Sequence, residues 1–264
     1  MGATLDDVGD ELDRVRHGIR HVEHEVVDGV RRGLTRAERD LSDGLRRWQL
    51  RAMHHPVRGC MDAMAAIAAV IGAIWLLHRT AGPWSRQLSI AVYALSLIGV
   101  FTVSALYHSV PWRASAKQRM QKLDHTMIFV LVAGTYTPIA LMALDGWIRT
   151  ATLVAVWSIA VVGAVQKWVL HHVGLWLSIT LQTVQGWMAL ALLVPLLRRL
   201  PTAAVGLIIA GGVLYTIGLV TLVSRRPFLW PRYFSYHEVM HVFVIAAAAC
   251  HFAMIARYVA PAVA

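Results

Sequence analysis

Three short motifs near the ends of apolar segments contain the residue types that a metal site requires. Ser104 and His108 are four residues apart at the end of one hydrophobic run, and Asp124 lies near the start of the next. His237 and His241 are again four residues apart, at the start of the last run. Residues at i and i+4 share one face of a helix, so each pair can direct both side chains to one point. Ionisable residues in a membrane segment are costly, and they mark a functional site by default.

Taken singly, these residues have ordinary structural explanations. A histidine at a helix end extends its ring toward the interface, and an aspartate in a first turn stabilises the helix dipole. Together, however, His108, His237 and His241 supply three imidazoles, with Asp124 beside them. Three protein ligands plus one position for water describe a catalytic Zn²⁺ site better than a closed structural site. Other divalent ions would accept the same ligands.

Two neighbouring residues are set apart from this group. His125 points about 100° away from Asp124 on a helix, so the two side chains do not face one small site. The string H-E-V-M-H at 237–241 has the spacing of zinc proteases, in which Glu238 would be the general base. The usual soluble helix with a third ligand downstream is missing, so we expect Glu238 to face an adjacent helix or the headgroup region.

The composition indicates the elements that must position these residues. With 57% hydrophobic and 15% charged residues, the chain is typical of an all-α polytopic membrane protein. The net charge of +10 suits anionic lipid headgroups better than nucleic acid, because no basic run is interleaved with aromatic residues. Seven stretches approach or exceed the roughly 20 residues that cross a bilayer. They cover residues 61–78, 87–108, 123–144, 148–166, 174–197, 202–223 and 237–257.

The distribution of Lys and Arg between these stretches predicts the orientation. Twelve lie on the N-terminal side of the membrane and six on the opposite side. By the positive-inside rule, a multi-pass protein of the plasma membrane with a cytoplasmic N-terminus and an external C-terminus is expected. His108, Asp124, His237 and His241 then all lie at the inner face.

Residues 1–55 form a separate unit before the seven-helix domain of residues 56–264. Apolar residues recur there at intervals of four and three, which places them in a stripe along one face of a helix. The arm is expected either to self-associate through residues 8–48 as a short coiled coil or to lie on the membrane surface. The valines of the stripe and the many acidic residues favour self-association.

The motifs together resemble the haemolysin III family, the bacterial branch related to the progestin and adipoQ receptors. The resemblance rests on S-A-L-Y-H at 104–108, K-L-D-H-T-M-I-F-V-L-V-A-G-T-Y-T-P at 122–138 and H-E-V-M-H at 237–241, within residues 57–258. It implies a seven-helix bundle with zinc near its inner face, held by His108, His237 and His241, with Asp124 and Ser104 beside the ligands. Related proteins often carry a Glu…Asn…His pattern around the first span. This chain reads R-G-C-M-D at 58–62 instead, so the resemblance assigns no role to that segment.

The sequence therefore predicts a zinc-dependent hydrolase that cleaves an acyl-linked lipid. Bound Zn²⁺ would lower the pKa of water toward about 7 and polarise a carbonyl, while Asp124 takes the proton of the water. Ser104 would orient the site or help to stabilise the oxyanion. An amide lipid is the expected substrate, by location and by analogy with the alkaline ceramidases of the wider superfamily. The alternative is a channel-like or membrane-stress protein with structural or regulatory zinc.

Overall fold

The computed structural model describes residues 29, 33, 35, 56–169, 175–227, 229 and 234–261. The chain divides between Ala52 and Met53, and the two parts are described separately. In the first part, Gly29, Gly33 and Thr35 are helical and exposed. The rest of the predicted arm, including the apolar stripe proposed for self-association, lies outside the described residues.

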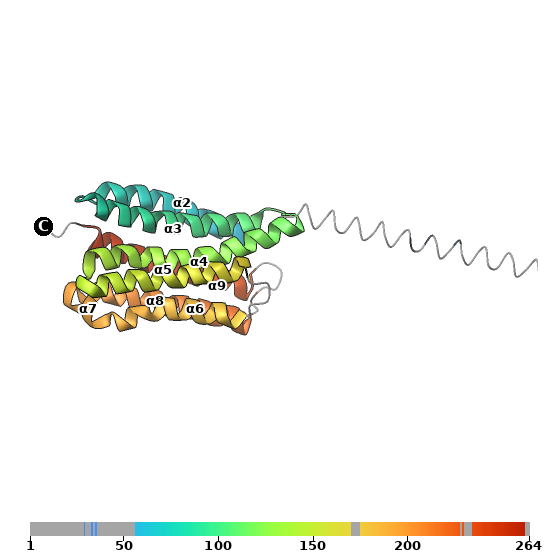
Figure 1. Cartoon of the computed structure of the whole chain (residues 1–264). Helices are drawn as coiled ribbons and strands as arrows, with labels where there is room; N and C mark the ends of the chain where they lie inside the picture. Colours follow the sequence, from blue (N-terminus) through green and yellow to red (C-terminus); the bar gives the residue numbers. More distant parts are fainter. Residues whose placement is uncertain are drawn as a thin grey trace, which may run out of the picture. The chain divides into compact units, whose positions relative to one another are not determined.

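From residue 56 onward the described chain is built of helices joined by short connections, which confirms the predicted all-α class (Figure 1). The helices are α2 (Pro56–Arg79), α3 (Trp84–Ser109), α4 (Ala114–Ala143), α5 (Gly146–Val169), α6 (Leu175–Ala191), α7 (Leu193–Arg199), α8 (Thr202–Ser224) and α9 (Tyr236–Met254). A π-helical turn over Ile255–Val259 extends α9.

Six of these helices are long and apolar enough to cross a membrane, and the pair α6–α7 makes a seventh if it crosses as one bent span. The predicted span at 174–197 is broken, since α6 and α7 meet at an angle of 49°. Pro195 accounts for the break. It has no N–H to donate, and its ring clashes with the carbonyl group four residues earlier, which belongs to Ala191 at the end of α6.

Two helices begin earlier than the hydropathy of the sequence indicates. α4 begins at Ala114 instead of residue 123, because the polar segment before the apolar run is rich in Ala, Lys, Gln and Arg, which form helices readily. Asp124 therefore lies in the third turn of α4. Stabilisation of the helix dipole does not explain its presence there, because that effect is limited to the first turn. α2 begins at Pro56, which brings Arg58 and Asp62 inside the helix.

Short connections make consecutive helices antiparallel neighbours. α2 packs mainly on α3, α3 on α4, α4 on α5 and α8 on α9, and α9 also contacts α2 (Figure 1). As a result α2, α4 and α9 begin at the same end of the bundle at which α3 ends. We call this end the site end.

The Gly-Thr-Tyr-Thr-Pro motif holds α4 against three neighbours. A Cβ on Gly134 would lie 2.8 Å from the Cβ of Ser96, so glycine allows α3 and α4 to approach closely. The hydroxyl of Tyr136 donates to the carbonyl of Gly186 in α6 at 2.9 Å. The indole of Trp157 in α5 donates to the hydroxyl of Thr137 at 3.2 Å. These contacts fix the position of α4, the helix that carries Asp124.

Candidate metal centre

Three histidines from two helices meet at the site end. His108 comes from the last turn of α3, and His237 and His241 come from the first two turns of α9. One ring nitrogen from each lies within 4.8 Å of the others. The rings of His237 and His241 are stacked at 16° with centroids 5.1 Å apart, and the ring of His108 stands edge-on to both. The structure thus brings together the three histidines that the sequence predicted as ligands.

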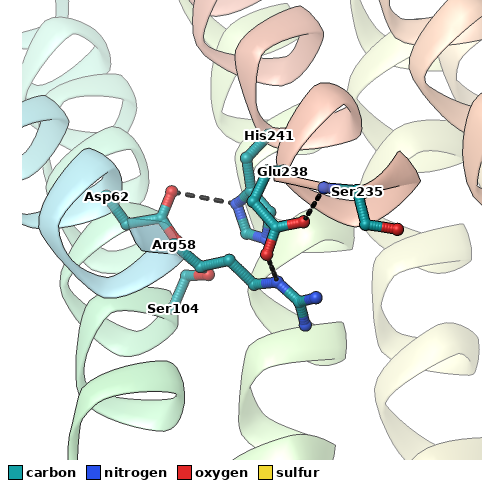
Figure 2. Close-up of polar contacts among 6 residues, drawn as sticks. All are labelled: Arg58, Asp62, Ser104, Ser235, Glu238 and His241. Atoms are coloured by element: carbon teal, nitrogen blue, oxygen red, sulfur yellow. Dashed lines mark hydrogen bonds and ion pairs between the residues drawn. The ribbon is translucent and has the colours of Figure 1, made fainter. Parts of the chain in front are cut away.

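The contacts of His241 distinguish its two ring nitrogens. Its Nδ1 lies 3.0 Å from Oδ1 of Asp62 (Figure 2). Its Nε2 is buried and has no hydrogen-bond partner within the described part of the chain. Buried polar atoms are nearly always paired, so this nitrogen needs an explanation. Coordination of a metal by Nε2 would explain it, because a ligating imidazole commonly donates its other N–H to a carboxylate.

Asp62 is the residue of this cluster that the sequence did not assign. It lies in α2 with 1% of its surface exposed, and its second oxygen accepts a hydrogen bond from Ser104 at 2.8 Å. A signal was available, since Asp62 is one of only four acidic residues after residue 55. Hydropathy alone does not distinguish it from an interfacial charge, because it lies at the edge of the predicted first span.

Ser104 and Asp124 also lie at the cluster. Ser104 is buried one turn before His108, on the same face of α3, as the spacing predicted. Asp124 is half-buried on α4, beside Ser104 and within electrostatic reach of His241 and Asp62. Four helices, α2, α3, α4 and α9, therefore contribute to this cluster of three histidines and two carboxylates.

Glu238 is occupied elsewhere, despite its place in the H-E-V-M-H string. One oxygen accepts from Nε of Arg58 at 2.6 Å, and the other accepts from the backbone N–H of Ser235 at 2.8 Å (Figure 2). The Ser235 contact is half of a capping box. In the other half, the side chain of Ser235 accepts a hydrogen bond from the backbone N–H of Glu238. Glu238 faces the adjacent helix α2, as expected, and serves as a cap and an ion-pair partner instead of a general base.

His125 and His251 lie outside the cluster. His125 is within electrostatic reach of Lys167 on α5, in agreement with its exclusion by helical geometry. His251 is further along α9, where its ring stacks on Tyr215 with centroids 5.8 Å apart. Neither belongs to the group whose ring nitrogens converge.

The donor set fits a divalent metal of the zinc type. Three imidazoles are typical zinc ligands, and small rotations of the rings would bring nitrogens that lie within 4.8 Å to the roughly 3.3 Å expected between ligands of a tetrahedral site. Asp62 and Asp124 would balance the double charge of the ion. The group of histidines could therefore hold a metal and leave room for a further ligand.

Comparisons with known proteins identify the family of this chain. The profile of the haemolysin-III-related family matches residues 52–252. "Hemolysin-3" of Bacillus cereus is 29% identical over 202 residues, which is 76% of this chain and 88% of that protein. "Hemolysin-3 homolog" of Bacillus subtilis (strain 168) is 31% identical over 198 residues, 75% of this chain and 89% of its own length. The human "Monocyte to macrophage differentiation factor" is 24% identical over 210 residues, 77% of this chain and 84% of that protein. The family match covers α2 to α8, most of α9 and all five predicted site residues, and the chain belongs to the haemolysin-III-related family.

Proposed function

We propose that this membrane protein is a zinc-dependent hydrolase that cleaves an acyl-linked lipid, with an amide as the preferred bond. The observation that carries the proposal is the convergence of His108, His237 and His241 beside Asp124. His241 Nε2, buried without a hydrogen-bond partner among the described residues, supports a role of this nitrogen as a ligand. Three imidazoles with an adjacent carboxylate form the kind of site that catalytic zinc uses.

His108, His237 and His241 would hold the ion. When bound, zinc would act as a Lewis acid toward the substrate carbonyl and would make a water molecule more acidic. The carboxylate of Asp124 accepts a proton from the attacking water and later delivers it to the leaving nitrogen. A C–O bond forms, the C–N bond breaks, and one water is consumed for each fatty acid and amine released.

Ser104 has a positioning role in this proposal. A hydroxyl has a single hydrogen to donate, and Ser104 is in contact with two carboxylates that can accept it, Oδ2 of Asp62 at 2.8 Å and the carboxylate of Asp124. These contacts favour orientation of the site over stabilisation of an oxyanion, the two roles that the sequence left open. The acyl-lipid substrate follows from the position of the cluster at the end of membrane-spanning helices and from the family resemblance.

The first test is zinc content per chain of protein purified in detergent without chelators. The wild type is expected to hold about one zinc, and the His237→Ala/His241→Ala variant is expected to lose it. His251→Ala is the matched control, because it removes a histidine from the same helix outside the cluster. A wild type without bound metal would refute the zinc mechanism.

A non-enzymatic membrane protein with structural zinc is the second candidate, favoured by the name of the bacterial relatives, "Hemolysin-3". The two candidates differ in their dependence on Asp124. A ceramide-type amide lipid and an ester lipid, each presented in mixed micelles, should be hydrolysed by the wild type and spared by Asp124→Asn. Zinc binding without hydrolysis of either substrate would favour the structural role.

A further inference from the structure

Asp62 is a buried carboxylate whose two oxygens are both engaged. Oδ1 lies 3.0 Å from Nδ1 of His241 (Figure 2), and Oδ2 accepts a hydrogen bond from Ser104 at 2.8 Å. α2 thereby contacts a candidate ligand on α9 and, through Ser104, the helix that carries His108. The contact joins residues 179 positions apart in the sequence.

The charge of Asp62 is not neutralised by an arginine or lysine among the described residues. Its contacts there are the ring of His241, which would carry a charge only if protonated, and the hydroxyl of Ser104. Arg58, one turn earlier on α2, is instead paired with Glu238. Burial of a carboxylate is costly unless a cation and hydrogen bonds compensate it. A cation held by the three histidines would provide the compensating charge that the other described residues do not.

The orientation of His241 leads to the same conclusion. An imidazole that donates from Nδ1 to Asp62 has its lone pair on Nε2. That Nε2 is the buried atom without a hydrogen-bond partner in the described chain. The carboxylate therefore selects the tautomer whose free lone pair belongs to the atom that needs a ligand.

We propose that Asp62 is a positioning residue for the metal, fixing the tautomer and ring orientation of His241 and supplying negative charge next to the ion. This inference rests on the proposed zinc site. It gives a role to a residue of the first span, a segment to which the family resemblance assigned none. Asp62 and Asp124 together match the double positive charge of a zinc held by three neutral imidazoles. Asp62 thus acts on the metal through His241, whereas Asp124 acts on the substrate water.

Zinc affinity, measured by competition with a chelator of known affinity, tests this role on the full-length protein in detergent. Asp62→Asn removes the charge and keeps an oxygen that can accept from His241, whereas Asp62→Ala removes both. Loss of the carboxylate partner of a metal-bound histidine typically weakens metal binding by about 10- to 100-fold. We expect Asp62→Asn near the lower end of that range and Asp62→Ala near the upper end.

Asp145→Asn is the matched control, because it makes the same chemical change at an exposed residue between α4 and α5. Its zinc affinity should equal that of the wild type. The melting temperature of each metal-free variant shows whether the bundle is still folded, and the Co²⁺ absorption spectrum reports the coordination of the metal that remains. If Asp62→Ala does not fold, Asp62→Asn takes its place in the comparison.

An affinity within about threefold of the wild type in Asp62→Ala, or a loss of equal size in Asp145→Asn, would overturn the assignment. A larger loss confined to the Asp62 variants supports it. A wild type that binds no zinc refutes the proposed site itself, which is a different result. Zinc binding without lipid hydrolysis would refute the hydrolase and leave the role of Asp62 intact.

Discussion

The ion pair between Arg58 and Glu238 should hold the start of α9, the helix that carries two of the three histidines. Its side chains are 13% and 6% exposed, and its atoms are 2.6 Å apart. Removal of one partner from a buried ion pair costs about 3–5 kcal/mol, because the other charge remains buried. In Arg58→Met, Glu238 would keep the N–H of Ser235 and the favourable end of the helix dipole, worth about 1 kcal/mol or less. Because the pair is part-buried, the lower part of the range applies, and we expect Arg58→Met to destabilise the protein by about 2–3 kcal/mol.

This change is measurable as a shift of the melting temperature in detergent. For a domain of this size, each kcal/mol corresponds to about 2–4 °C, which gives a decrease of about 4–12 °C. Arg58→Met/Glu238→Gln should recover most of the loss, because glutamine can still complete the capping box and no charge remains unpaired. Methionine replaces the aliphatic part of the arginine, so packing is largely kept.

The exposed pair between Arg199 and Asp145 provides the control. Its side chains are 61% and 57% exposed, and exposed pairs contribute about 0–1 kcal/mol. Arg199→Met should therefore shift the melting temperature little. Two results would refute a stabilising ion pair between α2 and α9. One is a loss of stability below about 1 kcal/mol in Arg58→Met, and the other is a double variant whose loss equals the sum of the losses of the two single variants.

Three further predictions concern the site and the bundle. Asp124→Asn should retain zinc while hydrolysis falls by at least about 100-fold, the usual contribution of a general base; activity within tenfold of the wild type would contradict the assignment. Gly134→Ala should cost about 1–3 kcal/mol in thermal unfolding, because the new Cβ lies 2.8 Å from the Cβ of Ser96. Gly206→Ala has open space around it within α8 and should stabilise the protein by up to about 1 kcal/mol, and equal effects of the two changes would show that the α3–α4 approach is not tight. Zinc at 100 times its dissociation constant should stabilise the protein by about 2.7 kcal/mol, and a melting temperature that does not rise with added zinc would count against a site formed only in the folded state.

Hydropathy and spacing in the sequence were enough to predict the membrane helices and the three converging histidines. The tendency of a segment to enter a bilayer depends on its own composition, so it can be evaluated without the fold. The pair His237 and His241 is likewise local, because four residues make about one helical turn. Short connections then place the end of α3 beside the start of α4. The break at Pro195 was also visible in the sequence, although hydropathy alone passes over it.

The contacts of Asp62 and Arg58 were decided by tertiary structure alone. Their partners His241 and Glu238 are 179 and 180 residues away, and nothing local indicates which face of α2 meets α9. In the sequence, a charged residue near the edge of an apolar run looks the same whether it faces lipid headgroups or a buried cluster. Hydropathy indicates how deep a residue lies in the membrane but not which neighbour its side chain faces. Only the packing of α2 against α9 buries Asp62 beside His241 and pairs Arg58 with Glu238, whereas the capping contact of Glu238 with Ser235 is local to α9.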